Sequence, residues 1–296
     1  KANSLLGAIH LATPAKVAVA PAMNQAMWNH AATLANIETL EQRGITLIGP
    51  DEGIQACGDV GPGRMEQPDN IVSHAVSLFK NGRLAGKKVV ITAGPTREAL
   101  DPVRYISNHS SGKMGFALAA AAIDAGAQVT LVCGPVSLPA PERCEVISVI
   151  SAEDMLKASL ATAADADIFI AAAAVVDYRP SIVAAQKIKK QGDSMTISLE
   201  KNPDIVSAVV QANPTLFVLG FAAETQDVET YARDKLQRKN LGAIIANDVS
   251  RTDVGFNADD NEVIWIDRTS TVVFSKRSKA QLARDIVEHL AKGPLN

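Results

Sequence analysis

The segment from Lys87 to Gly126 constrains the fold of this chain more than any other. An apolar, strand-like run over 87–93 leads into a long polar loop, and an alanine-rich, helix-like run over 113–125 follows it. In open α/β sheets the loops from strand to helix lie at the carboxyl ends of the strands, where such folds bind ligands. The loop reads GPTREALDPVRYISNHSSGKMG and is far longer than a turn requires. We therefore expect an α/β sheet whose ligand site begins at this loop.

The helix that follows the loop favours an anionic ligand. Its first N–H groups have no partners within the helix and point toward the loop, which suits a phosphate group. The alternative is a capped helix behind a solvated loop, with Ser110 or Ser111 as the N-cap residue. Gly94, Gly112 and Gly115 lack the G-x-G-x-x-G spacing, which disfavours a classical NAD site.

Composition limits the class of protein. The 296 residues suffice for two domains, and the net charge of −3 gives no electrostatic reason to expect a nucleic-acid or anionic-membrane partner. The sequence contains no apolar run long enough to span a membrane and no signal-peptide pattern, so we expect a cytoplasmic protein. Cys57, Cys133 and Cys144 form no C-x-x-C pair and have no metal-ligand spacing.

The chain divides into two parts at a short linker. Residues 1–80 contain too few strand-like runs for a stable sheet, and we interpret them as the back half of an α/β domain whose N-terminal half is missing. The linker, 81–86, contains two glycines. Residues 87–296 form the second domain.

Strands and helices alternate through the second domain. Predicted strands cover 87–93, 128–133, 145–149, 167–173, 194–199, 216–221 and 242–246, and predicted helices cover 113–125, 152–163, 203–211 and 227–239. A hairpin-like pair at 262–266 and 271–275 and a helix at 277–292 follow. This alternation predicts a doubly wound, Rossmann-like, mainly parallel sheet with right-handed crossovers and an antiparallel addition.

Two further loops at predicted strand ends carry small, acidic and basic residues. After 167–173 come the small residues 171–174, then Asp177, and then the basic KIKK stretch at 187–190, which in isolation is more often a solvated turn. In the second loop Asn202 and Pro203 precede a helix, and a role for Asn202 as N-cap with Pro203 at the first helical position would alone explain both residues.

The remaining loop and helix add an aromatic ring and two more cations. Phe221 follows an apolar strand and could stack on a base. Lys235 and Lys239 lie on one face of a predicted helix, where their repulsion would be relieved either by a polyanion or by a neighbouring carboxylate. Together these loops predict a nucleoside triphosphate site without a Walker A loop.

These motifs taken together identify a family. The segments GPTREALDPVRYISNHSSGKMG, AAAVVDYRP, KIKK, KNPDIV, GFAAET, KLQRKN and ANDVS closely resemble the phosphopantothenate–cysteine ligase domain of the bifunctional enzymes of bacterial coenzyme A biosynthesis. PAMNQAMW and QACGDVGPGRM resemble the C-terminal half of the partner domain, a flavodoxin-like phosphopantothenoylcysteine decarboxylase. Val176 stands where the family commonly has alanine.

The resemblance implies a reaction and its site. The ligase joins 4'-phosphopantothenate to L-cysteine through an acyl-cytidylate formed from CTP, with Mg²⁺ offsetting the charge of CTP, and we assign no metal ligands. The implied CTP site consists of Ala171, Ala172, Ala173, Asp177, Lys187, Pro203, Asp204, Ile205, Val206, Phe221, Lys235 and Lys239. Lys187 would steady the triphosphate, and Asn108 would act on the acyl-cytidylate. We also expect Arg104 to contact the phosphate or carboxylate of phosphopantothenate, which the resemblance does not itself imply.

The resemblance implies less for the first domain. Asn24 matches a residue that holds the decarboxylase substrate, and Cys57 matches the proton donor to the ene-thiol intermediate. The alternatives are that Asn24 caps a helix and that Cys57 is a loop thiol without a role. Because no segment matches the family's catalytic histidine, we expect this chain neither to bind FMN well nor to decarboxylate. The family implies homodimers through the ligase domain and larger assemblies of the full-length protein.

Two other classes of protein stay open. A short-chain oxidoreductase would need Tyr-x-x-x-Lys. Tyr231 and Lys235 have this spacing, but they lie on a predicted helix without a glycine-rich partner loop. A non-catalytic nucleotide-binding or assembly module would tolerate replacement of Lys187 by methionine.

Overall fold

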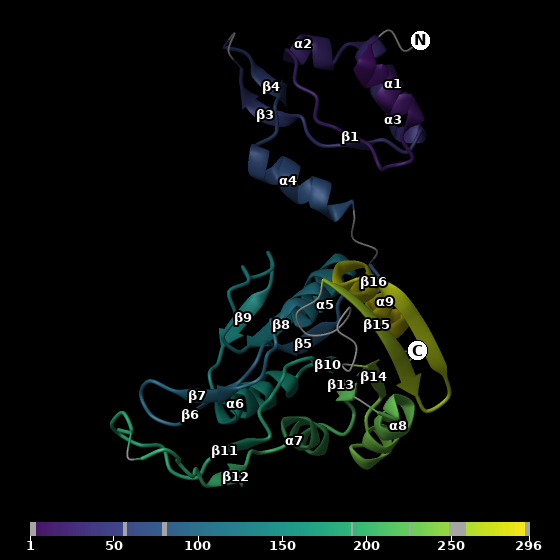
Figure 1. Cartoon of the computed structure of the whole chain (residues 1–296). Coiled ribbons are helices and arrows are strands. Elements are labelled where there is room, and N and C mark those ends of the chain that lie inside the picture. The colour runs from purple at the N-terminus through teal and green to yellow at the C-terminus, as the bar shows by residue number, and fades with distance from the viewer. Residues whose placement is uncertain are drawn as a thin grey trace. The chain divides into compact units, whose positions relative to one another are not determined.

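The structure is a computed structural model that describes residues 4–55, 58–78, 82–190, 192–224, 226–248 and 259–293. The chain forms two compact units, residues 1–80 and 81–296 (Figure 1). Within the described residues no helix combines the length and apolar character that crossing a membrane requires.

Unit 1, residues 1–80, contains short elements. Its helices are α1 (Leu5–Ala12), α2 (Gln25–Trp28), α3 (Ala31–Gln42) and α4 (Pro68–Ser77), and its strands are β1 (Ala18–Val19), β2 (Thr46–Leu47), β3 (Asp51–Ile54) and β4 (Val60–Arg64). β1 pairs in parallel with β2, and β3 and β4 form an antiparallel hairpin. We did not predict this hairpin from the sequence, because the glycines of β4 do not resemble a strand. At Gly63 a side chain is excluded, since an added Cβ would lie 2.1 Å from the carbonyl oxygen of Met23.

Unit 2, residues 81–296, is built on one eight-stranded sheet. Its strand order is β16-β15-β14-β13-β10-β5-β8-β9. The six parallel strands are β5 (Lys88–Ala93), β8 (Gln128–Cys133), β9 (Glu145–Ser148), β10 (Ile168–Ala171), β13 (Phe217–Glu224) and β14 (Ala243–Asp248). β15 (Asp260–Asp267) and β16 (Thr271–Ser278) continue the sheet in antiparallel pairing. The predicted doubly wound sheet with an antiparallel addition is confirmed.

Helices cover both faces of this sheet (Figure 1). α5 (Lys113–Asp124) and α9 (Lys279–Lys292) pack on one face, and α6 (Ala152–Ala163), α7 (Ile205–Ala212) and α8 (Val228–Arg238) pack on the other. Neighbouring residues of one strand enter opposite cores, as Phe169 does relative to Ile168 and Ile170. Because side chains of a strand alternate between its faces, the continuous apolar runs of the sequence fill two cores at once.

The chain changes direction at β5. From β5 it continues to β8 and β9, and it then crosses back to β10 on the other side of β5. Open α/β sheets bind ligands at such a switch point, outside the carboxyl ends of the two central strands. Here the carboxyl ends of β5 and β10 are extended by a bridge between Pro95 and Ala174.

Two small antiparallel pairs lie apart from the main sheet (Figure 1). β6 (Arg97–Ala99) pairs with β7 (Tyr105–Ser107), so part of the expected loop is a hairpin. β11 (Tyr178–Pro180) pairs with β12 (Leu199–Lys201). The predicted strand at 194–199 was therefore wrong except at its last residue, because the partner that defines the strand lies about 20 residues earlier in the chain and its pairing leaves no local pattern.

Candidate functional site

The first cavity of unit 2 lies at the carboxyl ends of β10 and β13. Its volume is about 600 Å³. The lining includes most of the residues expected to bind the nucleotide, namely Ala171, Ala173, Asp177, Pro203, Asp204, Ile205, Val206, Phe221, Lys235 and Lys239. Segments that are distant in the sequence therefore meet here because their strands are neighbours in the sheet.

The second cavity adjoins the first and has a volume of about 500 Å³. It is lined by the loop from Asn108 to Gly115 and by Ala172, which was also among the expected residues. Five residues line both cavities: Ala173, Val175, Asp177, Phe221 and Lys235. The two cavities are thus adjacent parts of one crevice at the switch point, where two ligands could lie side by side.

Helix α5 begins at the wall of the second cavity. Its N-cap residue is Gly112, which has a φ of 78°, and no described side chain caps the first turn. The alternative in which Ser110 or Ser111 is the N-cap was wrong, since Ser110 Oγ instead accepts a bond from the Gly112 N–H at 3.3 Å. A helix N-terminus without a side-chain cap attracts anions.

Asn108 faces this crevice with a fixed amide. Its Nδ2 donates to the carbonyl oxygens of Ala174 and Val175, both at 3.1 Å. Because a flipped amide would place its oxygen against those two carbonyls, the contacts determine its orientation. Asn108 therefore offers an acceptor, Oδ1, for any further contact.

The two lysines of α8 differ in their contacts. Lys239 forms an ion pair with Asp204 at 2.7 Å. Lys235 Nζ donates to the carbonyl oxygen of Phe221 at 3.1 Å. Of the two explanations for like charges on this face, a neighbouring carboxylate is the one observed for Lys239.

Asp204 has two roles at the start of α7. It is the N-cap residue, accepting a bond from the Ser207 N–H at 3.1 Å, so the prediction that Asn202 caps this helix was wrong. Burial alone would raise the pKa of Asp204, but the bonds from Lys239 and Ser207 outweigh it and lower the pKa. Asp204 is therefore a carboxylate, with a negative charge near the site.

Asn202 instead braces the loop that carries Asp177. Its backbone N–H donates to Asp177 O at 2.8 Å, and its Nδ2 donates to Val176 O at 2.7 Å. Thr96 Oγ1 also accepts a bond from the Val176 N–H, at 3.0 Å. Val176 itself is buried.

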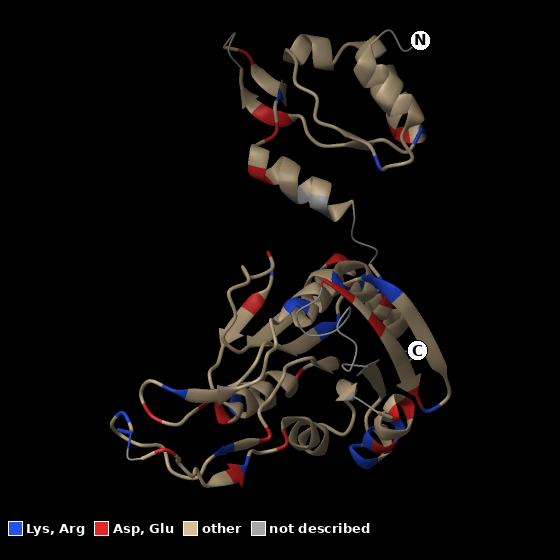
Figure 2. Cartoon of the chain, viewed as in Figure 1, with Lys and Arg blue, Asp and Glu red and all other residues tan. Residues whose placement is uncertain are grey.

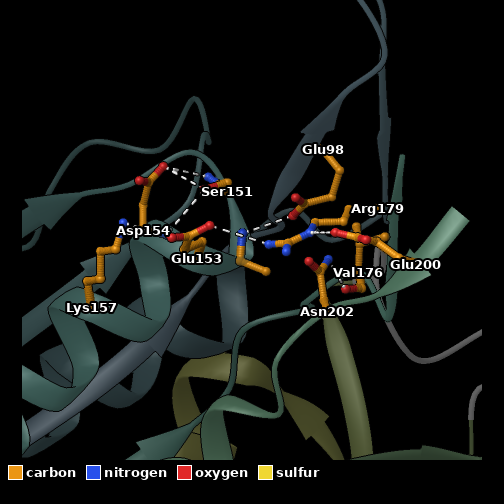
Figure 3. A network of polar contacts seen from close by, with 10 residues as sticks. Glu98, Ser151, Glu153, Asp154, Lys157, Val176, Arg179, Glu200 and Asn202 are labelled. Carbon is orange, nitrogen blue, oxygen red and sulfur yellow. Dashed lines mark hydrogen bonds and ion pairs between the residues drawn. The ribbon is translucent and has the colours of Figure 1, made fainter. Parts of the chain in front are cut away.

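A polar network surrounds this brace (Figure 3). Arg179 contacts Glu200 at 2.8 Å and Glu153 at 3.4 Å, and so connects β11 and β12 with α6. Glu98 is buried and accepts a bond from the N–H of Ala152, in the first turn of α6, at 2.9 Å. The side pairs β6/β7 and β11/β12 are thereby attached to the body of unit 2.

Lys187 and Arg104 lie outside the lining of both cavities. Lys187 is exposed in the segment 181–190. Arg104 donates to the carboxylate of Asp101 and, at 3.1 Å, to Ile188 O, and it lines a separate hollow of about 570 Å³ with the Lys189–Lys190 region. The expectation that Lys187 lies with the other nucleotide-binding residues is not met in this structure.

The second cavity is also lined by polar residues to which we assigned no role from the sequence. Asn247, Asn261 and Lys279 line it together with Lys113, which forms an ion pair with Asp259 at 2.6 Å. Burial and the charge of Lys113 lower the pKa of Lys279. Asn247 lies in β14, Asn261 in β15 and Lys279 at the start of α9, so the order of the strands in the folded sheet brings them to the crevice.

In unit 1 only part of the expected site is described. Asn24 is the N-cap of α2, where its Oδ1 accepts a bond from the Ala26 N–H at 2.8 Å, and its Nδ2 reaches Asp59 at 3.4 Å. The alternative of a capping role therefore holds for Asn24. Cys57 lies outside the described residues. Across the described chain, no group of three or more His, Cys, Asp or Glu side chains could hold a metal ion.

Comparisons with known proteins agree with the two-unit architecture. The family model described as DNA/pantothenate metabolism flavoprotein C-terminal domain matches residues 84–293, and the flavoprotein family model matches residues 3–80. The coenzyme A biosynthesis bifunctional protein CoaBC of Vibrio vulnificus is 53% identical over 293 residues, which are 97% of this chain and 73% of the relative. This chain belongs to the CoaBC family.

Other relatives support this membership. The CoaBC protein of Escherichia coli is 56% identical over 273 residues, covering 90% of this chain and 67% of the relative. A crystal structure of the C-terminal domain of a CoaBC protein superposes with a TM-score of 0.61 at 37% identity, covering 71% of this chain and 97% of that chain. The α/β fold class is confirmed by this likeness.

The comparisons do not support two expectations for unit 1. We expected the N-terminal half of the flavoprotein domain to be missing, but the flavoprotein model matches residues 3–80. We also expected FMN binding and decarboxylation to be lost, whereas membership of the flavoprotein family favours a flavin. Unit 1 therefore has a flavoprotein family match of its own.

Proposed function

We propose that unit 2 is a CTP-dependent ligase that joins 4'-phosphopantothenate to L-cysteine in coenzyme A biosynthesis. The observation that carries the proposal is the double cavity at the switch point, in which Asp177, Phe221 and Lys235 line both halves. A reaction between a nucleotide and an acid needs two adjacent sites with a shared wall, and positioning supplies much of the rate enhancement in such reactions. Membership of the CoaBC family supports the choice of substrates.

The reaction has two steps. In the first, a carboxylate oxygen of phosphopantothenate attacks the α-phosphorus of CTP, the bond from that phosphorus to pyrophosphate breaks, and an acyl-cytidylate forms. In the second, the amine of cysteine attacks the acyl carbon, the bond from that carbon to the CMP oxygen breaks, and the amine loses a proton. Activation is required because a free carboxylate is a poor acyl donor.

The residues of the crevice suit these steps. The negative charge of the triphosphate, and the charge that develops on pyrophosphate as it leaves, would be offset by Lys235, Lys239 and Lys187, the last from its exposed segment. Ala171 to Ala173 lack bulk and would let cytidine lie against the backbone near Phe221. Mg²⁺ bound to the phosphates of CTP would neutralise more of their negative charge.

Asn108 and the start of α5 suit the acyl half of the reaction. The Oδ1 of Asn108 would accept a hydrogen bond from the attacking amine, since its Nδ2 already serves the carbonyls of Ala174 and Val175. The N–H groups at the start of α5 would hold an anionic group of the acid substrate.

For unit 1 we propose a contribution to an FMN site. The residues present fit a flavin poorly by themselves, because α1, α2 and α3 of the described part contain no buried residue, whereas cofactor sites are enclosed and mostly apolar. Titration of the purified chain with FMN, followed by flavin fluorescence, tests the proposal, and unchanged fluorescence at micromolar protein would contradict it.

The ligase proposal is tested by pyrophosphate release from the purified chain with phosphopantothenate, L-cysteine and Mg²⁺. We expect release with CTP and much less with ATP or UTP, and we expect Lys187→Met to abolish most of it. Lys157→Met, which removes an exposed lysine on α6, is the matched control and should retain full activity. Absence of release with every nucleotide would favour the alternative of a non-catalytic nucleotide-binding or assembly module.

A further inference from the structure

Lys187 has an unexpected environment for a residue proposed to act on the triphosphate. It lies in an exposed, irregular segment and lines neither cavity. Lysine side chains are flexible and lose rotamer entropy when a ligand immobilises them. A lysine on such a segment can act efficiently only if the backbone beneath it is held in place.

The backbone on both sides of Lys187 is attached to one loop, the turn between β6 and β7. Ala184 N donates to Leu100 O at 3.0 Å. Ile188 N donates to the carboxylate of Asp101 at 3.1 Å, and this N–H belongs to the peptide bond that joins Lys187 to Ile188. The carbonyl oxygen of Ile188 accepts a bond from Arg104 Nη2 at 3.1 Å. The backbone N–H and carbonyl groups of Ile188 are therefore both held by side chains of the turn.

Asp101 is the centre of these contacts. Besides Ile188 N, its carboxylate accepts bonds from the backbone N–H groups of Val103 at 2.8 Å and Arg104 at 2.9 Å. It also accepts from the guanidinium of Arg104, through Nε at 3.0 Å and through Nη2. The Asp101 side chain is completely inaccessible to solvent, whereas that of Arg104 is 40% exposed.

The charge of Asp101 makes this arrangement strong. The hydrogen bond from Arg104 holds the pKa of Asp101 well below its ordinary value, against the opposing effect of burial, and the backbone donors of Val103, Ile188 and Arg104 lower it further. Hydrogen bonds to an ionised acceptor are roughly twice as strong as neutral ones. A buried carboxylate with this many donors stays ionised and has little freedom to move.

We propose that Asp101 is a positioning residue for Lys187: with Arg104 it clamps the Lys187–Ile188 peptide and thereby presents the Lys187 ammonium group to the triphosphate. This inference rests on the proposed function of Lys187. It also gives Arg104 a role in addition to the substrate contact that we expected, because its guanidinium completes the clamp on the carbonyl side.

The first test needs no nucleotide. Asp101→Asn keeps the size of the side chain but replaces one acceptor oxygen with a donor, so it cannot receive the full set of bonds. We expect trypsin to cleave the folded variant after Lys187, Lys189 and Lys190 about tenfold faster than the wild type, because cleavage follows the population of the open form. Asp167→Asn is the matched control: Asp167 also accepts from a backbone N–H, that of Lys88 at 2.8 Å, but at the amino end of β10.

The second test is a double-mutant cycle on the dissociation constant for CTP. We expect Asp101→Asn to weaken CTP binding about tenfold in the wild type and to have no further effect in the Lys187→Met background, because residues that act through one another are not additive. A merely structural role would lower the midpoint of thermal unfolding and leave the two effects additive. If Asp101→Asn does not fold, Arg104→Gln, which leaves the backbone donors to Asp101 intact, replaces it in both tests.

The outcomes separate this inference from the proposed function. Unchanged tryptic cleavage in Asp101→Asn would overturn the clamp whatever the chain binds. Faster cleavage of Asp101→Asn, together with additive effects of Asp101→Asn and Lys187→Met on CTP affinity, would show that Asp101 does not act through Lys187. Equal CTP affinity of the wild type and Lys187→Met would instead count against the proposed role of Lys187, while the cleavage assay would still decide whether Asp101 holds the segment.

Discussion

The carboxylate of Asp204 lies 2.7 Å from the ammonium group of Lys239, and both residues line the first cavity. The same carboxylate caps α7 by accepting the Ser207 N–H. An anionic ligand that uses Lys239 therefore has to compete with Asp204 for its charge. Asp204 and the triphosphate would therefore compete for the ammonium group of Lys239.

We predict that Asp204→Asn lowers the KM for CTP. Asparagine is an equally good N-cap residue, so the helix start is kept while the competing charge is removed. The loss of one partly exposed ion pair should reduce the free energy of unfolding by no more than about 1 kcal/mol. Steady-state pyrophosphate release and urea unfolding measure the two effects, and Lys239→Met should change KM in the opposite direction.

The turn between β15 and β16 makes the free energy of unfolding depend on pH. Burial by itself would raise the pKa of Asp267, but bonds from Trp265, Ser270 and Thr269 outweigh it and hold the pKa well below its ordinary value. A lowered pKa in the folded state stabilises the protein above the pKa of the unfolded state, about 4, and this contribution is lost as the pH falls below it.

We therefore predict that Asp267→Asn makes stability less sensitive to acid. The free energy of unfolding in urea, measured at about pH 7 and pH 3, should fall less for Asp267→Asn than for the wild type. Asp234→Asn, at a side chain that is 68% exposed, should behave like the wild type. An identical acid loss in Asp267→Asn and the wild type would contradict the stated origin of the lowered pKa.

Gly115 allows α5 to approach β5. A Cβ at this position would lie 2.6 Å from Ala93 Cβ, which is closer than real contacts permit. We predict that Gly115→Ala displaces the first turn of α5, lowers the free energy of unfolding by about 1–3 kcal/mol, and raises the KM for phosphopantothenate. Thermal or urea unfolding together with the kinetic assay checks this, and unchanged values of both would show that the helix tolerates the shift.

Thr96 also holds the loop that carries Asp177. It is fully buried, and its Oγ1 accepts a bond from the Val176 N–H. Thr96→Val keeps the shape but leaves that N–H without an acceptor, so we predict a loss of about 1–3 kcal/mol in unfolding free energy and a weaker affinity for CTP.

A matched control for Thr96 lies on α6. Thr162 Oγ1 donates to the Ala158 carbonyl at 2.8 Å, so Thr162→Val removes only a donor to a helix carbonyl. We expect that variant to change stability by less than about 0.5 kcal/mol and CTP affinity not at all. Equal effects of the two substitutions would mean that the Thr96 hydroxyl has no special role.

The regular elements of unit 2 were predictable from sequence because their patterns are local. The helix at 152–163 was predicted with its observed bounds, and in the structure Ser151 caps it. The strands over 88–93 and 128–133 show continuous apolar runs that only buried strands require. The pairs β6/β7 and β11/β12 were missed because each strand is only three residues long and shows no apolar alternation.

The sequence by itself determined which residue types meet at the ends of the strands, because each motif directly follows a strand of local apolar character. Only the tertiary structure decided how those residues are used. The strand order brings Asp204 to Lys239, Asn202 to Val176 and Asp101 to Ile188, and it leaves Lys187 outside the cavity lining. The physical reason is that these partners are 26 to 87 residues apart along the chain, so their contacts depend on sheet order and packing, which no local pattern encodes.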